Sequence, residues 1–120
     1  MPFQYVLANL LADNPDAEAA LFLDDAGETV DFACAEQSPY EMRLLGAYLG
    51  IYLRLIGGML SEAQLGATRL CHIERASHHI HLIALPDGYY LVLVQRRPAK
   101  VGKARRSLQA AAEQLRSEVF

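Results

Sequence analysis

SPYEMRLLGAYLGIYLRLIGGMLS, residues 38–61, is the stretch that decides the fold. It opens with three helix-start signals. Ser38 can cap the N-terminus, Pro39 suits the first helical position, and Glu41 can complete a capping box. These signals predict a helix that runs from Ser38 to about Ser61 and measures roughly 34 Å.

The apolar character of this stretch raises the possibility of a membrane-spanning helix, because only Arg54 is charged between Leu44 and Leu60. Seventeen residues lie at the short limit for a span. An arginine near the middle costs about 2.5–3.5 kcal/mol even on insertion scales. We therefore expect no membrane insertion. The first five residues, MPFQY, show no signal peptide, and a cytoplasmic location is expected.

The apolar residues of this helix form one broad arc, which a helical wheel predicts to face a sheet. They are Leu44, Leu45, Tyr48, Leu49, Tyr52, Leu55, Ile56, Met59 and Leu60. Three glycines, Gly46, Gly50 and Gly57, form a narrow stripe on the opposite side. A glycine inside a helix costs about 1 kcal/mol relative to alanine, so the glycine stripe indicates a close approach to the backbone. We expect contact with another helix or another chain; the alternative is an exposed face of poor helix propensity.

The sequence on either side predicts short strands and two amphipathic helices. The helices are expected over 3–13 and 99–119, and the strands over 19–24, 28–34, 67–75, 78–85 and 89–95. A length of 120 residues with 52% apolar and 21% charged residues predicts a single folded domain spanning 1–120. Cys34 and Cys71 are too few for a disulfide scaffold and are expected to behave as small buried hydrophobes.

This order of elements resembles the roadblock/dynein light chain domain. The resemblance runs from about Phe3 to Leu115 and rests on ALFLDDAG (20–27), the central helix, DGYYLVLV (87–94) and the terminal helix. It implies an α+β fold of order α-β-β-α-β-β-β-α. Its five-stranded antiparallel sheet would carry the long central helix on one face and the terminal helices on the other.

The resemblance also implies a homodimer in which third strands pair edge to edge and central helices lie side by side. The expected dimer interface comprises Gly46, Gly50, Leu53, Gly57, Arg69, Cys71 and Ile73. The expected partner-docking residues are Arg43, Ala47 and Arg54, because planar guanidinium groups suit two-point contacts with carboxylates and phosphates.

Family members are non-enzymatic platforms for Ras-like small GTPases or adaptors in larger complexes. Bacterial members resembling MglB activate a polarity GTPase of the MglA type. The function expected is a non-catalytic regulator or scaffold that binds a Ras-like small GTPase. The alternative is an adaptor that assembles with other roadblock-type or polarity proteins without GTPase contact. No cofactor is expected.

Enzymatic motifs are absent from the sequence, which contains neither a Gly-x-x-x-x-Gly-Lys-Ser/Thr phosphate-binding loop nor a Gly-x-Ser-x-Gly elbow. A remote alternative is a metal-binding enzyme that uses His72, His79 and His81, which would share one face of two neighbouring strands. We favour histidines that form polar surface.

Charge is unevenly distributed along the chain. Residues 1–42 hold nine acids and no Lys or Arg, whereas 43–120 hold all eleven bases and five acids. Six of the bases lie within 96–106. This distribution suits either two solvated faces or an acidic and a basic docking surface. Nucleic acid is not expected as a partner, because the basic run lacks interleaved aromatics.

Overall fold

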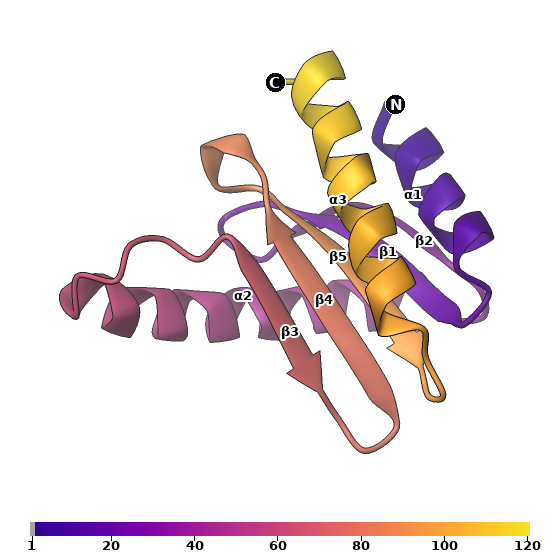
Figure 1. Ribbon diagram of the computed structural model, residues 1–120, viewed down its shortest axis with the longest axis horizontal. Helices are drawn as coiled ribbons and strands as arrows, with labels where there is room; N and C mark the ends of the chain where they lie inside the picture. The colour runs from indigo at the N-terminus through magenta and orange to yellow at the C-terminus, as the bar shows by residue number, and fades with distance from the viewer. Residues whose placement is uncertain (1) are drawn as a thin grey trace.

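A computed structural model describes residues 2–120 (Figure 1). Its elements are α1 (Pro2–Asp13), β1 (Ala17–Leu23), β2 (Thr29–Cys34), α2 (Pro39–Glu62), β3 (Leu70–Glu74), β4 (His78–Ala84), η1 (Pro86–Gly88), β5 (Tyr90–Arg96) and α3 (Val101–Glu118). The predicted α-β-β-α-β-β-β-α order is confirmed. The third strand is shorter than predicted, since it begins at Leu70.

The five strands form one antiparallel sheet in the order β2-β1-β5-β4-β3. β1 and β5 are central, and β2 and β3 are the edges. Tight turns join β1 to β2 and β3 to β4, as the hairpin signals predicted. The pairing of β1 with β5 joins the first hairpin to the three-stranded meander.

The terminal helices cover one face of the sheet side by side, and α2 crosses the other face (Figure 1). Under α1 and α3 the core is continuous. Its fully buried side chains include Leu7, Phe22, Leu91, Leu93, Leu108 and Leu115. On the other face Met42 and Leu49 of α2 pack against a core of strand residues that includes Leu21 and Val92. The predicted placement of the helices on the two faces is confirmed.

The start of α2 has the predicted cap. The Ser38 Oγ accepts a hydrogen bond from the Glu41 backbone N–H at 3.1 Å and lies 3.3 Å from Glu41 Oε1. Pro39 occupies the first helical turn. These contacts fix where the helix leaves the loop after β2.

The predicted orientation of α2 is wrong. Gly46 and Gly50 are buried, whereas much of the arc assigned to the sheet is exposed. The reason lies in the β1–β2 turn, whose Gly27 has φ 82° and packs its backbone against the helix. A Cβ at Gly50 would stand 2.5 Å from Gly27 Cα. At Gly46 and Gly50 the close approach indicated by the glycine stripe therefore comes from this chain's own turn, whereas Gly57 faces open space.

Candidate functional site

The exposed side of α2 carries a row of large apolar side chains, which we call the apolar row. It consists of Leu44, Tyr48, Ile51, Tyr52, Leu55 and Met59. Tyr48, Leu55 and Met59 are each more than 60% exposed, at 63%, 64% and 64%. Contiguous apolar surface of this kind on a folded domain marks a site of association.

The geometry of α2 explains this exposure. The helix crosses the sheet, and its second half extends past the β3 edge (Figure 1). A Cβ at Gly57 or Gly58 would have no neighbouring atom within 4 Å. By length and composition alone, α2 is long and apolar enough to cross a membrane. Its most apolar 18-residue stretch has a mean hydropathy of 1.4, and 22% of that stretch is buried. The first half of α2 is packed within this fold, because Gly46 and Gly50 lie against the β1–β2 turn.

The β3 edge shares an apolar core with α2, since Leu53 of α2 and Cys71 and Ile73 of β3 pack against the same cluster. β3 pairs only with β4 within residues 2–120, so one of its sides presents backbone N–H and C=O groups. Cys71 and Ile73 are half-buried on the α2 face, and burial raises the pKa of the Cys71 thiol. An edge with half-exposed apolar side chains is a template for pairing with another strand.

The structure separates the predicted dimer residues into two groups. Leu53, Gly57, Arg69, Cys71 and Ile73 are half-buried or exposed, along the second half of α2 and near β3. Gly46 and Gly50 are covered by the β1–β2 turn and present no surface to a second chain. Assigning these two glycines to a dimer interface is therefore wrong, because their missing side chains make room for Gly27.

The predicted docking residues Arg43, Ala47 and Arg54 are all exposed on α2. Arg43 and Ala47 line a hollow of about 360 Å³ with the start of β2. Arg54 lines a second hollow of about 270 Å³, and its Nη1 donates to Asp25 O at 3.4 Å. The β1–β2 turn packs between these hollows. It covers Gly46 and Gly50, which were expected from the sequence to form an open stripe between Arg43 and Arg54.

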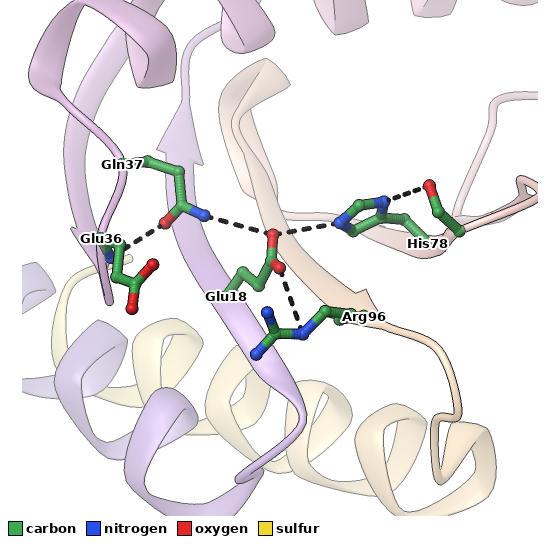
Figure 2. Close-up of polar contacts among 6 residues, drawn as sticks. Glu18, Glu36, Gln37, His78 and Arg96 are labelled. Atoms are coloured by element: carbon green, nitrogen blue, oxygen red, sulfur yellow. Dashed lines mark hydrogen bonds and ion pairs between the residues drawn. The ribbon is translucent and has the colours of Figure 1, made fainter.

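Glu18 forms a polar network that sequence reasoning missed (Figure 2). Its Oε2 accepts from Gln37 Nε2 at 3.2 Å and lies 3.1 Å from His78 Nε2, while its Oε1 lies 3.5 Å from Arg96 Nε. One carboxylate thus links β1 to the β2–α2 loop, to β4 and to β5. The available signal was that Glu18 is the one charged residue in an otherwise apolar strand, AEAALFL.

At the start of the β2–α2 loop, a cysteine side chain donates a hydrogen bond. The Cys34 Sγ donates to Gln37 O at 3.0 Å, and Gln37 reaches Glu18 with its side chain. Both cysteines are half-buried rather than fully buried. Together with the Ser38 cap, these contacts fix the first turn of α2 and hence the direction of the apolar row.

The three histidines come together on the other face of the sheet, as the strand register predicted. His72 is directly opposite His81, and His72 Nε2 lies 2.9 Å from His79 Nδ1. The expectation of polar surface is wrong for two of them, since His79 and His81 are 6% and 1% exposed. Burial of these rings depends on the packing of α3 over β4, which the sequence did not reveal.

The rings do not have the arrangement of a three-histidine metal site. His81 stacks on His72 with centroids 4.5 Å apart, and its Nε2 lies 2.7 Å from Gln95 Oε1. Stacked rings do not direct lone pairs at a common point. Within residues 2–120 no group of three or more His, Cys, Asp or Glu side chains is arranged to hold a metal ion.

Solved structures identify the architecture. A roadblock/LC7 domain from Streptomyces avermitilis superposes with a TM-score of 0.84 at 15% identity, covering 94% of this chain and 93% of that one. Myxococcus xanthus MglB also gives 0.84, at 17% identity, covering 98% and 96%. The chain has the roadblock/LC7 fold.

The roadblock fold also relates the chain to Myxococcus xanthus MglC. The TM-score is 0.73 at 20% identity, with 99% of this chain and 100% of that chain covered. No sequence-family profile and no curated relative matches the chain. The similarity to these proteins is therefore one of fold. It agrees with the resemblance drawn from the order of helices and strands.

Proposed function

We propose that this roadblock-fold chain is a non-catalytic homodimeric regulator or scaffold that binds a Ras-like small GTPase in the cytoplasm. Its role would be GTPase activation or a platform for cell polarity or motility. The observation that carries the proposal is the exposed apolar row of α2 together with the β3 edge on the same side of the sheet. The likeness in fold to MglB supports it.

A second copy of the chain is the occupant that best fits this surface. The apolar row, with Leu53 and Gly57, would pack against the same helix of the second copy. The edges at Cys71 and Ile73 would pair, which continues the sheet and satisfies the backbone groups that β3 presents. Stable interfaces bury about 1,200–2,000 Å² in total, so a stable dimer would use the helix face and the strand edge together.

The GTPase would dock on the exposed side of the paired helices through Arg43, Ala47 and Arg54. Hydrolysis would take place on the GTPase, because this sequence has no phosphate-binding loop. Arg43 and Arg54 from both copies would place four guanidinium groups on one surface. Such groups pair with the carboxylates of switch loops in two-point contacts.

Two measurements, made one after the other, test the proposal. Light scattering with size-exclusion chromatography should give a dimer at micromolar concentration, and Tyr52→Asp should convert it to a folded monomer. Pulldown with candidate GTPases loaded with a GTP analogue or GDP should then show binding that depends on the nucleotide. A monomeric parent chain would overturn the dimer. Binding only to other roadblock proteins, in either nucleotide state, would favour the adaptor alternative.

A further inference from the structure

The open edge of β3 presents backbone groups from every second residue. The Arg75 N–H donates to His78 O at 2.8 Å, and at the other end of the ladder the Ala84 N–H donates to Arg69 O at 2.9 Å. Hydrogen-bonded and non-hydrogen-bonded pairs alternate along an antiparallel ladder, so the odd-numbered residues of β3 direct their N–H and C=O groups toward β4. The even-numbered residues therefore direct theirs to the open edge. They are Leu70, His72 and Glu74.

The edge of β3 is accessible to another strand. Within residues 2–120 it pairs with β4 and with no other strand. Its even-numbered side chains are exposed on the α3 face, where Leu70 is opposite Ile83. The His72 ring stacks on His81 with centroids 4.5 Å apart, so it lies over β4 rather than over the open edge. A further strand can therefore join the sheet here.

A second copy of the chain can pair with this edge in few registers. This step rests on the proposed homodimer, in which the apolar rows of both copies meet on one side of the sheet. The two-fold axis is then perpendicular to the sheet, so residues that face each other across it lie on the same face. Since successive residues alternate between faces, the registers of largest overlap are centred on Cys71, His72 or Ile73.

The backbone groups favour the register centred on His72, which we call the centred register. It pairs His72 with itself and Leu70 with Glu74 of the second copy, so every outward-directed residue of β3 meets another one within the strand. A centre one residue earlier pairs Glu74 with Thr68, and a centre one residue later pairs Leu70 with Ala76. Both Thr68 and Ala76 lie outside β3. The centred register alone therefore uses all the outward N–H and C=O groups of the strand within the strand.

The side chains on the α2 face favour the same register. In the centred register the half-buried Cys71 faces the half-buried Ile73 of the second copy, so apolar groups meet. Either neighbouring register instead places an arginine opposite one of them, Arg69 opposite Ile73 or Arg75 opposite Cys71. The centred register has one cost. It places the exposed Arg69 opposite the exposed Arg75 at both ends of the pair, where like charges repel.

We propose that two copies pair their β3 edges in the centred register, and that Arg69 and Arg75 are the specificity-determining residues of this edge. Their mutual repulsion limits the affinity of the homodimer. A strand with a carboxylate opposite either arginine pairs more tightly than the chain pairs with itself. The two arginines therefore set which strands the edge prefers.

Disulfide trapping tests the register. Odd-numbered residues form non-hydrogen-bonded pairs across the axis, where Cα atoms lie about 4.5 Å apart, a separation that a disulfide can bridge. Two chains are mixed, one with Cys34→Ser and the native Cys71, the other with Cys34→Ser, Cys71→Ala and Ile73→Cys. Oxidised glutathione should cross-link one chain to the other, as mass spectrometry of the linked peptides shows. Neither chain should cross-link to itself.

A charge-reversal series tests the two arginines. Arg75→Glu places a carboxylate opposite Arg69 at both ends of the centred register, so the dimer dissociation constant should fall about fivefold or more at low ionic strength. Arg69→Glu should have the same effect, and the double variant should lose it, because like charges then face each other again. Arg97→Glu is the control, since it makes the same change in net charge at an exposed position outside β3. Sedimentation equilibrium measures each dissociation constant.

Four results would overturn the proposal. Self-cross-linking of the Cys71 chain would centre the pair on Cys71, and self-cross-linking of the Ile73→Cys chain would centre it on residue 73. A dimer that forms no cross-link in the mixture would exclude all three registers. An equal response to Arg75→Glu and Arg97→Glu would remove the arginine pairs. In each case the homodimer stands, whereas a monomeric parent chain would overturn the homodimer together with the register.

Discussion

The two faces of the sheet differ in how completely they are covered. Beneath α1 and α3, Leu7, Phe22 and Leu108 are at most 1% exposed. On the other face, α2 buries only Met42, Gly46, Leu49 and Gly50 and exposes the apolar row. The covered face supplies the stability of the single chain. The half-covered face has apolar surface that only another molecule can cover, so the two faces should respond differently to the same substitution.

The largest difference is expected between Leu108→Ala and Leu55→Ala. Leu108 is fully buried beneath α3, and its truncation should lower the free energy of unfolding by about 2–5 kcal/mol. Leu55 is 64% exposed, and its truncation should change the stability of the single chain by less than about 0.5 kcal/mol. Urea unfolding at low protein concentration measures both. Equal losses would show that Leu55 packs against the single chain as firmly as Leu108 does.

A second pair compares two glycines of α2. Gly50→Ala should destabilise the chain by about 1–3 kcal/mol, because the new Cβ would stand 2.5 Å from the Gly27 backbone. Gly58→Ala should stabilise it by up to about 1 kcal/mol, because Gly58 is a helical residue surrounded by open space. Thermal unfolding separates the two. A neutral Gly50→Ala would contradict the close packing of the turn on the helix.

Helix and strand positions followed from local sequence, but the orientation of α2 did not. Capping at Ser38, the hairpin turns and the amphipathic periods are local signals that agree with one another. The wheel failed because it assumed that the largest apolar arc faces the sheet, whereas the approach of Gly27 turns Gly46 and Gly50 inward. That approach joins residues roughly twenty positions apart, and no local pattern encodes it.

The candidate sites show the same limit. Strand alternation placed His79 and His81 on one face with His72 across from them, and the structure confirms this. It could not show that two of the rings would be buried beneath α3. Glu18 escapes sequence reasoning because a lone charge in a strand has no partner nearby in the chain, while its partners come from three other segments.

The covered face should also show a distinctive pH dependence. Burial lowers the pKa of His81 despite its bond to Gln95, with help from the charges of His72, His79 and Arg105. Burial and the charges of His79 and Arg105 likewise lower the pKa of His72. Since the folded state resists protonation, stability should be full above about pH 6.5 and should fall as the pH drops below it.

His81→Asn tests this pH dependence. Urea midpoints between about pH 7.5 and pH 5, in buffer free of sulfate and phosphate, should fall less steeply for the variant than for the parent chain. His78→Asn is the control, because His78 contacts Glu18 on the opposite face. Identical slopes in the parent chain and His81→Asn would remove the buried histidine as the cause.

The smallest effect on folding is expected from Arg43→Ala combined with Arg54→Ala. Both side chains are exposed, so unfolding and dimerisation should be nearly unchanged. Affinity for a GTPase partner should weaken, with each exposed contact contributing about 0.5–1 kcal/mol. Calorimetry with the partner found by pulldown measures the loss. Unchanged affinity would remove these arginines from the docking surface.

The pairing of β1 with β5 has a consequence for the speed of folding. Leu21 is opposite Val92, so the centre of the sheet joins residues about seventy positions apart, whereas the hairpins on either side close locally. Contacts between such distant residues form late and slow the search for the native state. Refolding should therefore be limited by the meeting of two preformed halves, and stopped-flow refolding should be slowed by truncations at this seam more than by truncations within either hairpin.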